Sequence, residues 1–324
     1  MTQADSSAIE RMLVRIFGDQ STRWERTAEG VSTEVYRIRR GEQRFYLRLP
    51  VDEKSGFAAQ AAVHAELRRL GVAVPEIVHY DPFDEGLRRA VLVTTEVPGR
   101  PMISYGPGGR GFLDDPGATE LSSIYRAAGR DLALVNQVPV DGFGWIRDDH
   151  GELPLRAEHP DFGRWIGRFD TAPLRNLGFG ADTVLRIERI VAAEVRQAPA
   201  HGRLAHGDFY VSHVFHQDGQ YTGMIDFGDI QGSNRWHDLA TFRLSDPNRN
   251  TTLEDAAVPH LEAGYAEVAG EPPDFHERIQ GTAITIMAER LTRQYREEGE
   301  AALRQASFRI FLHHLRRLLR EPAG

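Results

Sequence analysis

Two short acidic motifs stand about twenty residues apart in the second half of this chain. The first is His206-Gly207-Asp208, and the second is Ile225-Asp226-Phe227-Gly228-Asp229, with His213 between them. Phosphoryl transfer needs a carboxylate that orients the attacking hydroxyl, and metal ligands that hold the triphosphate. The segment offers both kinds of group, so it predicts a kinase that acts on small molecules.

Each motif also has a plainer interpretation. Asp208 sits in a predicted turn, where a carboxylate can orient an acceptor hydroxyl, although Asp is common in turns for structural reasons. Asp226 follows a short apolar run, and a carboxylate at a strand end is well placed to ligate Mg²⁺. His213 can ligate a metal through a neutral imidazole, bond phosphate or simply pack, and Asp229 is a weaker second ligand.

The composition excludes several classes of function. With 324 residues and 41% hydrophobic content, the chain can build one large domain or two lobes around a cleft. Its net charge of -8 argues against nucleic acid as the main partner and is compatible with a cationic small molecule. The absence of cysteine excludes disulfides, zinc–thiolate sites and thiol nucleophiles.

The first residues of the chain carry acidic groups and no long apolar run, so they do not resemble a signal peptide. No segment approaches the roughly 20 apolar residues that span a bilayer. We therefore expect a cytoplasmic protein with no membrane and no nucleic acid among its partners.

The first third of the chain alternates between helical and strand patterns. Helices are expected over residues 7–17 and 58–70, and strands over 35–39, 45–49, 77–80 and 91–95. Pro98-Gly99 then breaks the pattern. We therefore predict two units, a nucleotide-binding lobe over residues 1–97 and a catalytic and acceptor-binding lobe over residues 98–324.

The rest of the chain reads as mainly helical. Amphipathic helices are expected over residues 121–135 and 183–196, and residues 301–320 are strongly periodic and rich in arginine. Short strands are expected only around the two acidic motifs, between residues 204 and 227. The candidate catalytic and metal-binding residues of these motifs would therefore lie on loops between short strands, in the larger and mainly helical lobe.

The motifs resemble those of the aminoglycoside phosphotransferase and choline-kinase-like family. Its His-x-Asp and Ile-Asp-aromatic motifs match His206, Asp208, Asp226 and Phe227, and its Asp-Leu-Ala motif matches residues 238–240. The resemblance implies that Asp208 is the catalytic base, that Asp226 is the principal metal ligand, and that Asp238 braces the catalytic loop. It also implies Mg²⁺, with ATP or GTP as co-substrate.

The same resemblance implies the fold class. It is an α+β, bilobal, protein-kinase-like fold, with an N-terminal antiparallel sheet lobe and a larger, mainly helical C-terminal lobe. Two positions depart from the family pattern. His213 replaces an Asn metal ligand, and Arg48 replaces the phosphate-binding Lys. Arginine presents a planar fork rather than a point charge, so the phosphate contacts must differ. Both departures resemble, more loosely, the macrolide phosphotransferase branch, which tends to accept GTP.

The nucleotide-binding residues of the first lobe follow from order and spacing within the resemblance. Glu66 lies on the helix after Arg48 and could pair with it, or could instead be a surface residue beside Arg69. Gly30 and Ser32 stand where a phosphate-covering loop belongs.

The linker between the lobes supplies the remaining contacts to the nucleotide. The Thr95 carbonyl and the Val97 amide are implied to bond the purine edge. These contacts would use backbone groups, so the side chains say little about them.

Three functions remain open from the sequence. The first is an active phosphotransferase that moves the γ-phosphate of ATP or GTP to a small-molecule hydroxyl. The acceptor would be an aminoglycoside- or macrolide-type antibiotic, or a metabolic choline, sugar or amino alcohol. The second is a non-catalytic nucleotide-binding module on the same fold, motivated by Arg48 and His213. The third is a metal-dependent hydrolase, motivated by a cluster of His201, His206, Asp208, His213 and His216.

Overall fold

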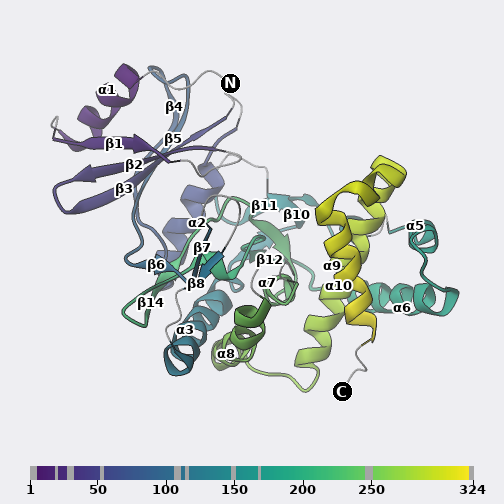
Figure 1. The fold of residues 1–324 in the computed structure, drawn as a ribbon. Coiled ribbons are helices and arrows are strands. Elements are labelled where there is room, and N and C mark those ends of the chain that lie inside the picture. Colours follow the sequence, from purple (N-terminus) through teal and green to yellow (C-terminus); the bar gives the residue numbers. More distant parts are fainter. Residues whose placement is uncertain are drawn as a thin grey trace.

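The computed structural model has two lobes (Figure 1). It describes residues 6–18, 21–27, 33–51, 55–105, 111–113, 117–146, 151–166, 169–244 and 251–320. The N-terminal lobe is an antiparallel sheet with two helices, and the C-terminal lobe is larger and mainly helical. The predicted bilobal α+β, kinase-like fold is confirmed.

The N-terminal lobe is built on one five-stranded antiparallel sheet in the order β1-β2-β3-β5-β4. Its strands are β1 (Arg23–Arg26), β2 (Thr33–Arg40), β3 (Gln43–Pro50), β4 (Ile77–Asp84) and β5 (Arg89–Thr95), and its helices are α1 (Ser6–Phe17) and α2 (Ala58–Arg69). Buried and half-buried residues alternate along β2, as in a strand with one face on the core. Ile9 and Met12 of α1 pack against that face, beside Tyr36 and Ile38.

The C-terminal lobe combines long helices with short strands. The helices are α3 (Ala118–Val135), α4 (Phe162–Ile166), α5 (Ala172–Asn176), α6 (Ala181–Gln197), α7 (His237–Phe242), α8 (Thr251–Ala269), α9 (Phe275–Glu298) and α10 (Ala306–Arg320). Helices α3 and α8 approach backbone to backbone. A Cβ on Gly129 would lie 2.1 Å from the Leu261 carbonyl oxygen, and one on Gly264 would lie 1.9 Å from that of Arg126.

Short strands surround the segment that carries the two acidic motifs. A small closed barrel contains β9 (Pro139–Asp141), β10 (Phe143–Ile146), β11 (Leu155–His159), β12 (Gly202–Ala205) and β15 (Gln231–Ser233). A three-stranded sheet joins β6 (Arg100–Pro101), β13 (Val214–Gln217) and β14 (Gln220–Met224), while β7 (Ile103–Tyr105) pairs with β8 (Gly111–Leu113). The barrel strands at residues 139–159 and 231–233 were not expected from the sequence, which predicted mainly helix there.

The strongly periodic residues 301–320 do not form a single helix. Residues Gly299–Arg304 form a 3₁₀ helix, and α10 begins only at Ala306. Gly299 has a φ of 60°, a left-handed conformation that ends α9 and lets the chain turn. Among the described residues, no helix is both long and apolar enough to cross a membrane.

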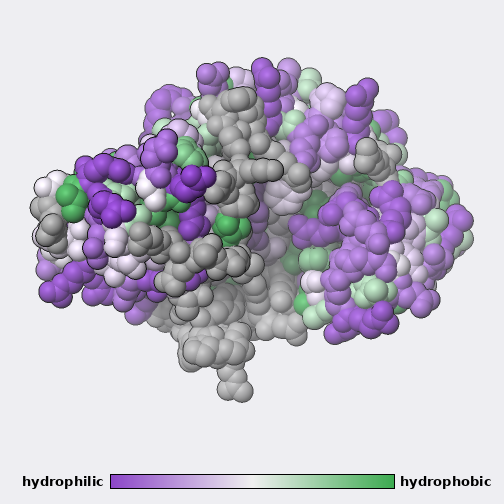
Figure 2. All heavy atoms as spheres, turned by 90° about the horizontal axis from the view of Figure 1, so that it is seen from above, coloured by the Kyte–Doolittle hydropathy of each residue, from purple (hydrophilic) through white to green (hydrophobic). Residues whose placement is uncertain are grey.

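The lobe boundary after Val97 remains our proposal, and strand pairing supports it. Strand β5 ends at Thr95 in the N-terminal sheet, whereas Arg100 and Pro101 already pair with β13 of the other lobe. Viewed from above, hydrophilic flanks stand on either side of a hollow, along which apolar side chains reach the surface (Figure 2).

Candidate active site

A buried carboxylate holds the loop that carries the first acidic motif. Asp238, at the start of α7, is fully buried and accepts hydrogen bonds from the backbone N–H groups of His206 and Gly207, at 2.9 and 3.0 Å. The Asn136 side-chain amide donates a third bond, at 2.9 Å. Charge-assisted bonds to backbone N–H groups are strong and directional, so they fix the path of the loop. Asp238 therefore braces the loop, as expected.

Steric contact joins the two acidic motifs. Gly207 has a φ of 83°, and a Cβ there would lie 1.8 Å from the Asp229 carbonyl oxygen. No other residue type fits a position that combines a left-handed backbone with such a close approach. The main chain before Asp208 is thus held directly against the second motif.

His206 adds a hydrogen bond between the motifs. Its Nε2 lies 2.9 Å from the Ile225 carbonyl oxygen, and its ring lies 4.5 Å from that of Phe227. Burial, assisted by the neighbouring His213, lowers the pKa of His206 to about 4. The imidazole is therefore neutral at pH 7, and its Nε2–H donates to the Ile225 carbonyl because that oxygen can only accept. This bond positions the strand end from which Asp226 emerges.

Three sequence-predicted residues meet in one cluster. One ligand atom each from Asp208, His213 and Asp226 lies within 4.8 Å of the others. His213 Nδ1 is 2.6 Å from the Asp208 carbonyl oxygen, so Nδ1 carries the proton. In the neutral ring, Nε2 then keeps its lone pair, and it lies 3.7 Å from Asp226 Oδ2.

This donor set fits a divalent cation. Asp226 supplies a carboxylate, and His213 supplies its Nε2 nitrogen. The Asp208 carbonyl fixes the tautomer of the His213 ring, an arrangement typical of ligating histidines. Asp226 also has a φ of 71°, which is unusual for a residue other than glycine and recurs at functional sites. The Asp226 side chain is 46% exposed, so it remains accessible to an ion and a phosphate.

Arg48 faces this cluster from the sheet lobe. Its Nη2 lies 3.8 Å from Asp226 Oδ1, and its Nη1 donates to Gln60 Oε1 at 3.0 Å. Burial lowers the pKa of the guanidinium, and the Asp226 charge partly opposes this shift. An arginine beside a cluster of candidate metal ligands can donate two parallel hydrogen bonds to phosphate oxygens.

Of the two interpretations of Glu66, the pairing with Arg48 is wrong and the position beside Arg69 is confirmed. Glu66 instead forms two 2.7 Å bonds with Arg69, three positions along α2, and the partner of Arg48 is Gln60. Glu66 thus points away from the cluster, for a reason that helical geometry explains. Gln60 and Glu66 are six positions apart, so they lie on different faces of the helix, and the face with Gln60 meets the sheet.

A cavity of about 770 Å³ opens between the lobes beside this cluster. Its lining includes Arg48, Thr95, Val97, Asp208, Asp226 and Asp229. Thr95 and Val97 line it where the chain passes from β5 to the second lobe, as a purine-binding linker would. Gly30 and Ser32, predicted in a phosphate-covering loop, lie outside the described residues.

The wider histidine and aspartate cluster is not assembled. Within the described ranges, the only group that could hold a metal is Asp208, His213 and Asp226. His216 is buried in β13, with 2% exposure, and His201 does not join the group. The multi-histidine site expected for a hydrolase is therefore not formed.

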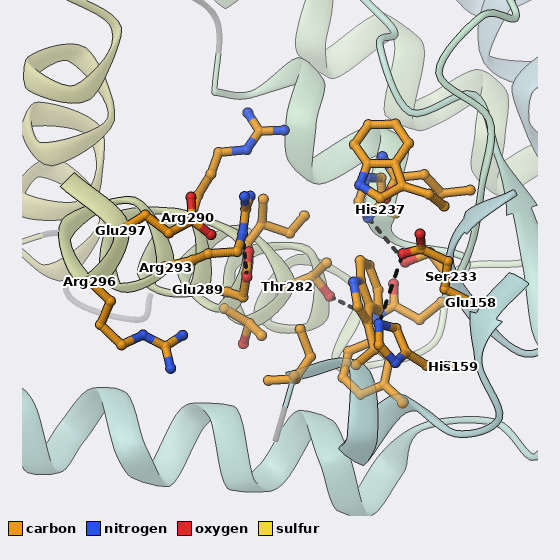
Figure 3. A pocket seen from close by; sticks show the side chains of 18 residues that line it. Glu158, His159, Ser233, His237, Thr282, Glu289, Arg290, Arg293, Arg296 and Glu297 are labelled. Carbon is orange, nitrogen blue, oxygen red and sulfur yellow. Dashed lines mark hydrogen bonds and ion pairs between the residues drawn. The ribbon is translucent and has the colours of Figure 1, made fainter. Parts of the chain in front are cut away.

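A second pocket, of about 500 Å³, lies in the C-terminal lobe, and its individual lining residues were not predicted from the sequence (Figure 3). Charged side chains of α9 lie along one side, and Glu158, His159, Ser233 and His237 lie on the other. Its residues come from positions 145 to 297, so no local spacing could have found it.

Asp229 and Gln231 connect the second pocket to the catalytic loop. Asp229 lines the interlobe cavity, and Gln231 lines the second pocket and lies beside Gly207. Burial and the charges of Asp208 and Asp226 raise the pKa of Asp229, whereas Arg290 of the second pocket opposes this rise. Residues only two positions apart in the chain thus line the two cavities.

Comparisons with known proteins agree with this geometry. A sequence model of the "Phosphotransferase enzyme family" (APH) matches residues 23–278. A search of curated proteins gives no significant match.

Solved structures share the fold over nearly the whole chain. Aminoglycoside phosphotransferase APH(4)-Ia is 17% identical with a TM-score of 0.65, covering 99% of this chain and 100% of that chain. A thermostable mutant of it, in ternary complex with ADP and hygromycin B, is 16% identical with a TM-score of 0.65, covering 98% and 99%. Macrolide 2'-phosphotransferase MphH from Brachybacterium faecium is 18% identical with a TM-score of 0.54, covering 98% and 99%.

At these identities the solved structures show a common fold, while the family model spans most of the chain. Both agree with the resemblance drawn from His206, Asp208 and Asp226. The chain belongs to the phosphotransferase enzyme family.

Proposed function

We propose that this protein is a small-molecule O-phosphotransferase that moves the γ-phosphate of ATP or GTP to a hydroxyl of its acceptor. The observation that carries the proposal is the meeting of Asp208, His213 and Asp226 within 4.8 Å. Arg48 lies beside this cluster, on the wall of an interlobe cavity that can hold a nucleotide. A carboxylate, a metal-type ligand pair and a phosphate-binding cation are the parts that phosphoryl transfer needs.

In this proposal, each residue of the cluster has one role. The Asp208 carboxylate accepts the hydrogen bond of the acceptor hydroxyl and takes its proton as the oxygen attacks the γ-phosphorus. The bond from the γ-phosphorus to the bridging oxygen breaks, and the nucleoside diphosphate leaves with that oxygen. Arg48 binds phosphate oxygens and orients them, and the linker at Thr95 and Val97 holds the purine.

Asp226 and His213 Nε2 would hold Mg²⁺. The bound ion would supply positive charge that offsets the negative charge of the phosphates. The donor set is more nitrogen-rich than Mg²⁺ prefers, so Mn²⁺ is a useful second ion to test. His213 keeps its tautomer through the Asp208 carbonyl, which couples the metal ligand to the catalytic loop.

We place the acceptor in the second pocket, because one of its lining residues, Gln231, lies beside Gly207, which directly precedes Asp208. Antibiotics of the aminoglycoside or macrolide type are the first acceptors to test, since two structural neighbours are named for such activities. Metabolic sugars and amino alcohols are the second group. The cytoplasm, which supplies ATP and GTP, is the compartment in which we propose that the reaction occurs.

Mass spectrometry of a mixed reaction tests the proposal. The native protein is incubated with Mg²⁺, ATP, GTP and a pool of aminoglycosides, macrolides, choline-like alcohols, sugars and sugar acids. We expect one compound to gain the mass of a phosphoryl group with native protein and not with Asp208→Asn. Nucleotide binding without any phosphorylated product, across a widened pool, would instead support the non-catalytic module.

A further inference from the structure

The second pocket has an aromatic wall that an acceptor can cover. Trp145 of β10 is 36% exposed, an unusually large open surface for tryptophan, and Trp165 of α4 also lines the pocket. Gly144 lets Trp165 and His159 approach the strand, because a Cβ there would lie 3.1 Å from the His159 ring and 3.4 Å from the Trp165 ring. Indole surfaces that line a pocket favour flat apolar ligand surfaces, such as a sugar face or an aromatic ring.

The opposite wall, on α9, carries alternating charges, of which Glu289 and Arg293 form an ion pair at 2.9 Å. Glu297 of the same helix is exposed, whereas Glu158 lies on the facing side of the pocket, beside His159. The carboxylates of Glu158 and Glu297 thus stand on different sides of the pocket and do not converge as a polycation would need.

Arg290 of α9 lines the pocket and forms no ion pair with another described residue. It is half-buried, and its guanidinium lies over the Phe311 ring, 5.1 Å from the centroid. Its charge opposes the burial-driven rise in the pKa of Asp229 and adds to the burial-driven fall in the pKa of His237. Arg290 thus adds a positive charge to the wall of the second pocket.

His237 supplies a polar group on the aromatic side. It is 3% exposed, its Nδ1 lies 3.0 Å from Ser233 Oγ, and its ring stacks on Trp165. Its buried Nε2 has no hydrogen-bond partner among the described residues, although the side chain lines the pocket. Buried polar groups are usually satisfied, and an unsatisfied one in a pocket wall points to a ligand or an ordered water.

We infer that the acceptor is a hydroxylated compound with a flat apolar face and one carboxylate. The apolar face lies against Trp145 and Trp165, and the carboxylate lies against Arg290. His237 Nε2 bonds a polar group of the same ligand. This inference rests on the proposed phosphotransfer for the identity of the pocket as the acceptor site. It narrows the acceptors tested, because it places an acidic ring compound ahead of a polycationic aminoglycoside despite the chain's net charge of -8.

Calorimetry with matched probes tests this inference without requiring catalysis. Phenyl β-D-glucuronide and phenyl β-D-glucoside both carry a phenyl group on a pyranose sugar. The glucuronide has a carboxylate where the glucoside has a hydroxymethyl group. Kanamycin serves as the polycation. Each is titrated into native protein saturated with Mg²⁺ and a non-hydrolysable ATP analogue, whose own binding is measured first.

We expect the glucuronide to bind about tenfold or more tightly than the glucoside, because a carboxylate gains a charge-assisted bond from arginine. Arg290→Gln should abolish this preference, and Arg290→Lys should retain part of it. Arg309→Gln, an exposed arginine on α10 outside the pocket, is the matched control and should leave the preference unchanged. Thermal melting of each variant checks that it is folded.

Equal binding of the two glycosides, no binding of the glucuronide, or tightest binding of kanamycin would overturn the inference. These outcomes are separate from those of the proposed function. Phosphorylation of kanamycin would uphold phosphotransfer and overturn the acidic acceptor. Conversely, glucuronide binding that depends on Arg290, with no phosphoryl transfer to any compound, would uphold the acidic site and overturn the proposed function.

Discussion

The catalytic segment and the second pocket are built in different ways. Residues 206–238 gather most catalytic groups in one stretch of chain, held by the buried Asp238 and by backbone contact at Gly207. The second pocket draws its walls from residues 145 to 297, and its chemistry depends on how α9 faces the barrel strands. The first region is rigid and acidic, whereas the second is aromatic with charged groups of both signs.

This difference separates reaction from specificity. In the proposed function, the interlobe cavity and the acidic cluster act on the nucleotide, the metal ion and the hydroxyl, whereas the second pocket selects the acceptor. We therefore expect that single substitutions on α9 or β10 change the acceptor without disturbing Asp238 or Gly207. Function is therefore argued from each site and not from the fold alone.

The strongest test of this division between reaction and specificity is to remove the proposed base. Asp208→Asn keeps the shape of the side chain but cannot take a proton, so we expect kcat to fall about 100-fold to 10,000-fold. Nucleotide affinity should change little, because Asp208 acts on the acceptor. Steady-state kinetics and calorimetry measure the two effects, with Asp218→Asn in the turn between β13 and β14 as the control. Near-normal turnover in Asp208→Asn would refute the assigned base.

The next largest effect should follow from Asp226→Asn. Asparagine tolerates the left-handed backbone at this position, so the substitution removes charge while keeping the turn. We expect the affinity for Mg²⁺-nucleotide to fall at least about tenfold. Metal-free nucleotide should bind no more weakly, since a negative charge has left the phosphate site. Calorimetry with and without Mg²⁺ separates these results, and an unchanged Mg²⁺ dependence would contradict the assigned ligand.

A stability measurement tests the steric contact between the two motifs. Gly207→Ala must place a Cβ against the Asp229 carbonyl in a left-handed backbone, so we expect a loss of about 3 kcal/mol in unfolding free energy. Gly71→Ala is the control, because Gly71 has a nearly identical φ of 85° but nothing within 4 Å. It should lose only about 1 kcal/mol. Equal losses in urea unfolding would show that the contact is unimportant.

The smallest effects should distinguish the two candidate partners of Arg48. Gln60→Ala removes the bond to Arg48 Nη1, so we expect KM for the nucleotide to rise by a few-fold. Glu66→Gln disrupts only the exposed pair with Arg69 and should change KM by less than about twofold. Both values come from the same steady-state assay. A larger effect at Glu66 than at Gln60 would reverse our assignment.

The sequence could predict the sheet lobe and the acidic cluster because their signals are local. Strand alternation in β2 and β3 and the spacing of Asp208, His213 and Asp226 are read within short windows. The bounds of strand β1 could not be predicted, since its residues are mostly exposed and show no apolar alternation. The barrel strands have three to five residues, too few for a period to be recognised.

The errors at the site have a geometric cause. Order along the chain placed a helix after Arg48, but it could not give the rotation that turns Gln60 rather than Glu66 toward it. Arg290 and Trp145 line the same pocket although they are 145 residues apart in sequence. Net charge, a property of the whole chain, could not report the charges that line this one pocket.

The most direct test of phosphotransfer follows the γ-phosphate itself. ATP and GTP carrying ¹⁸O on the γ-phosphoryl oxygens are incubated with native protein, Mg²⁺ and the acceptor pool, and every product is examined by mass spectrometry. We predict a heavy phosphoryl group on an acceptor hydroxyl, unlabelled nucleoside diphosphate, and neither product with Asp208→Asn. Heavy phosphate released only to water would instead identify a hydrolase, and bound nucleotide with no labelled product would contradict catalysis by this site.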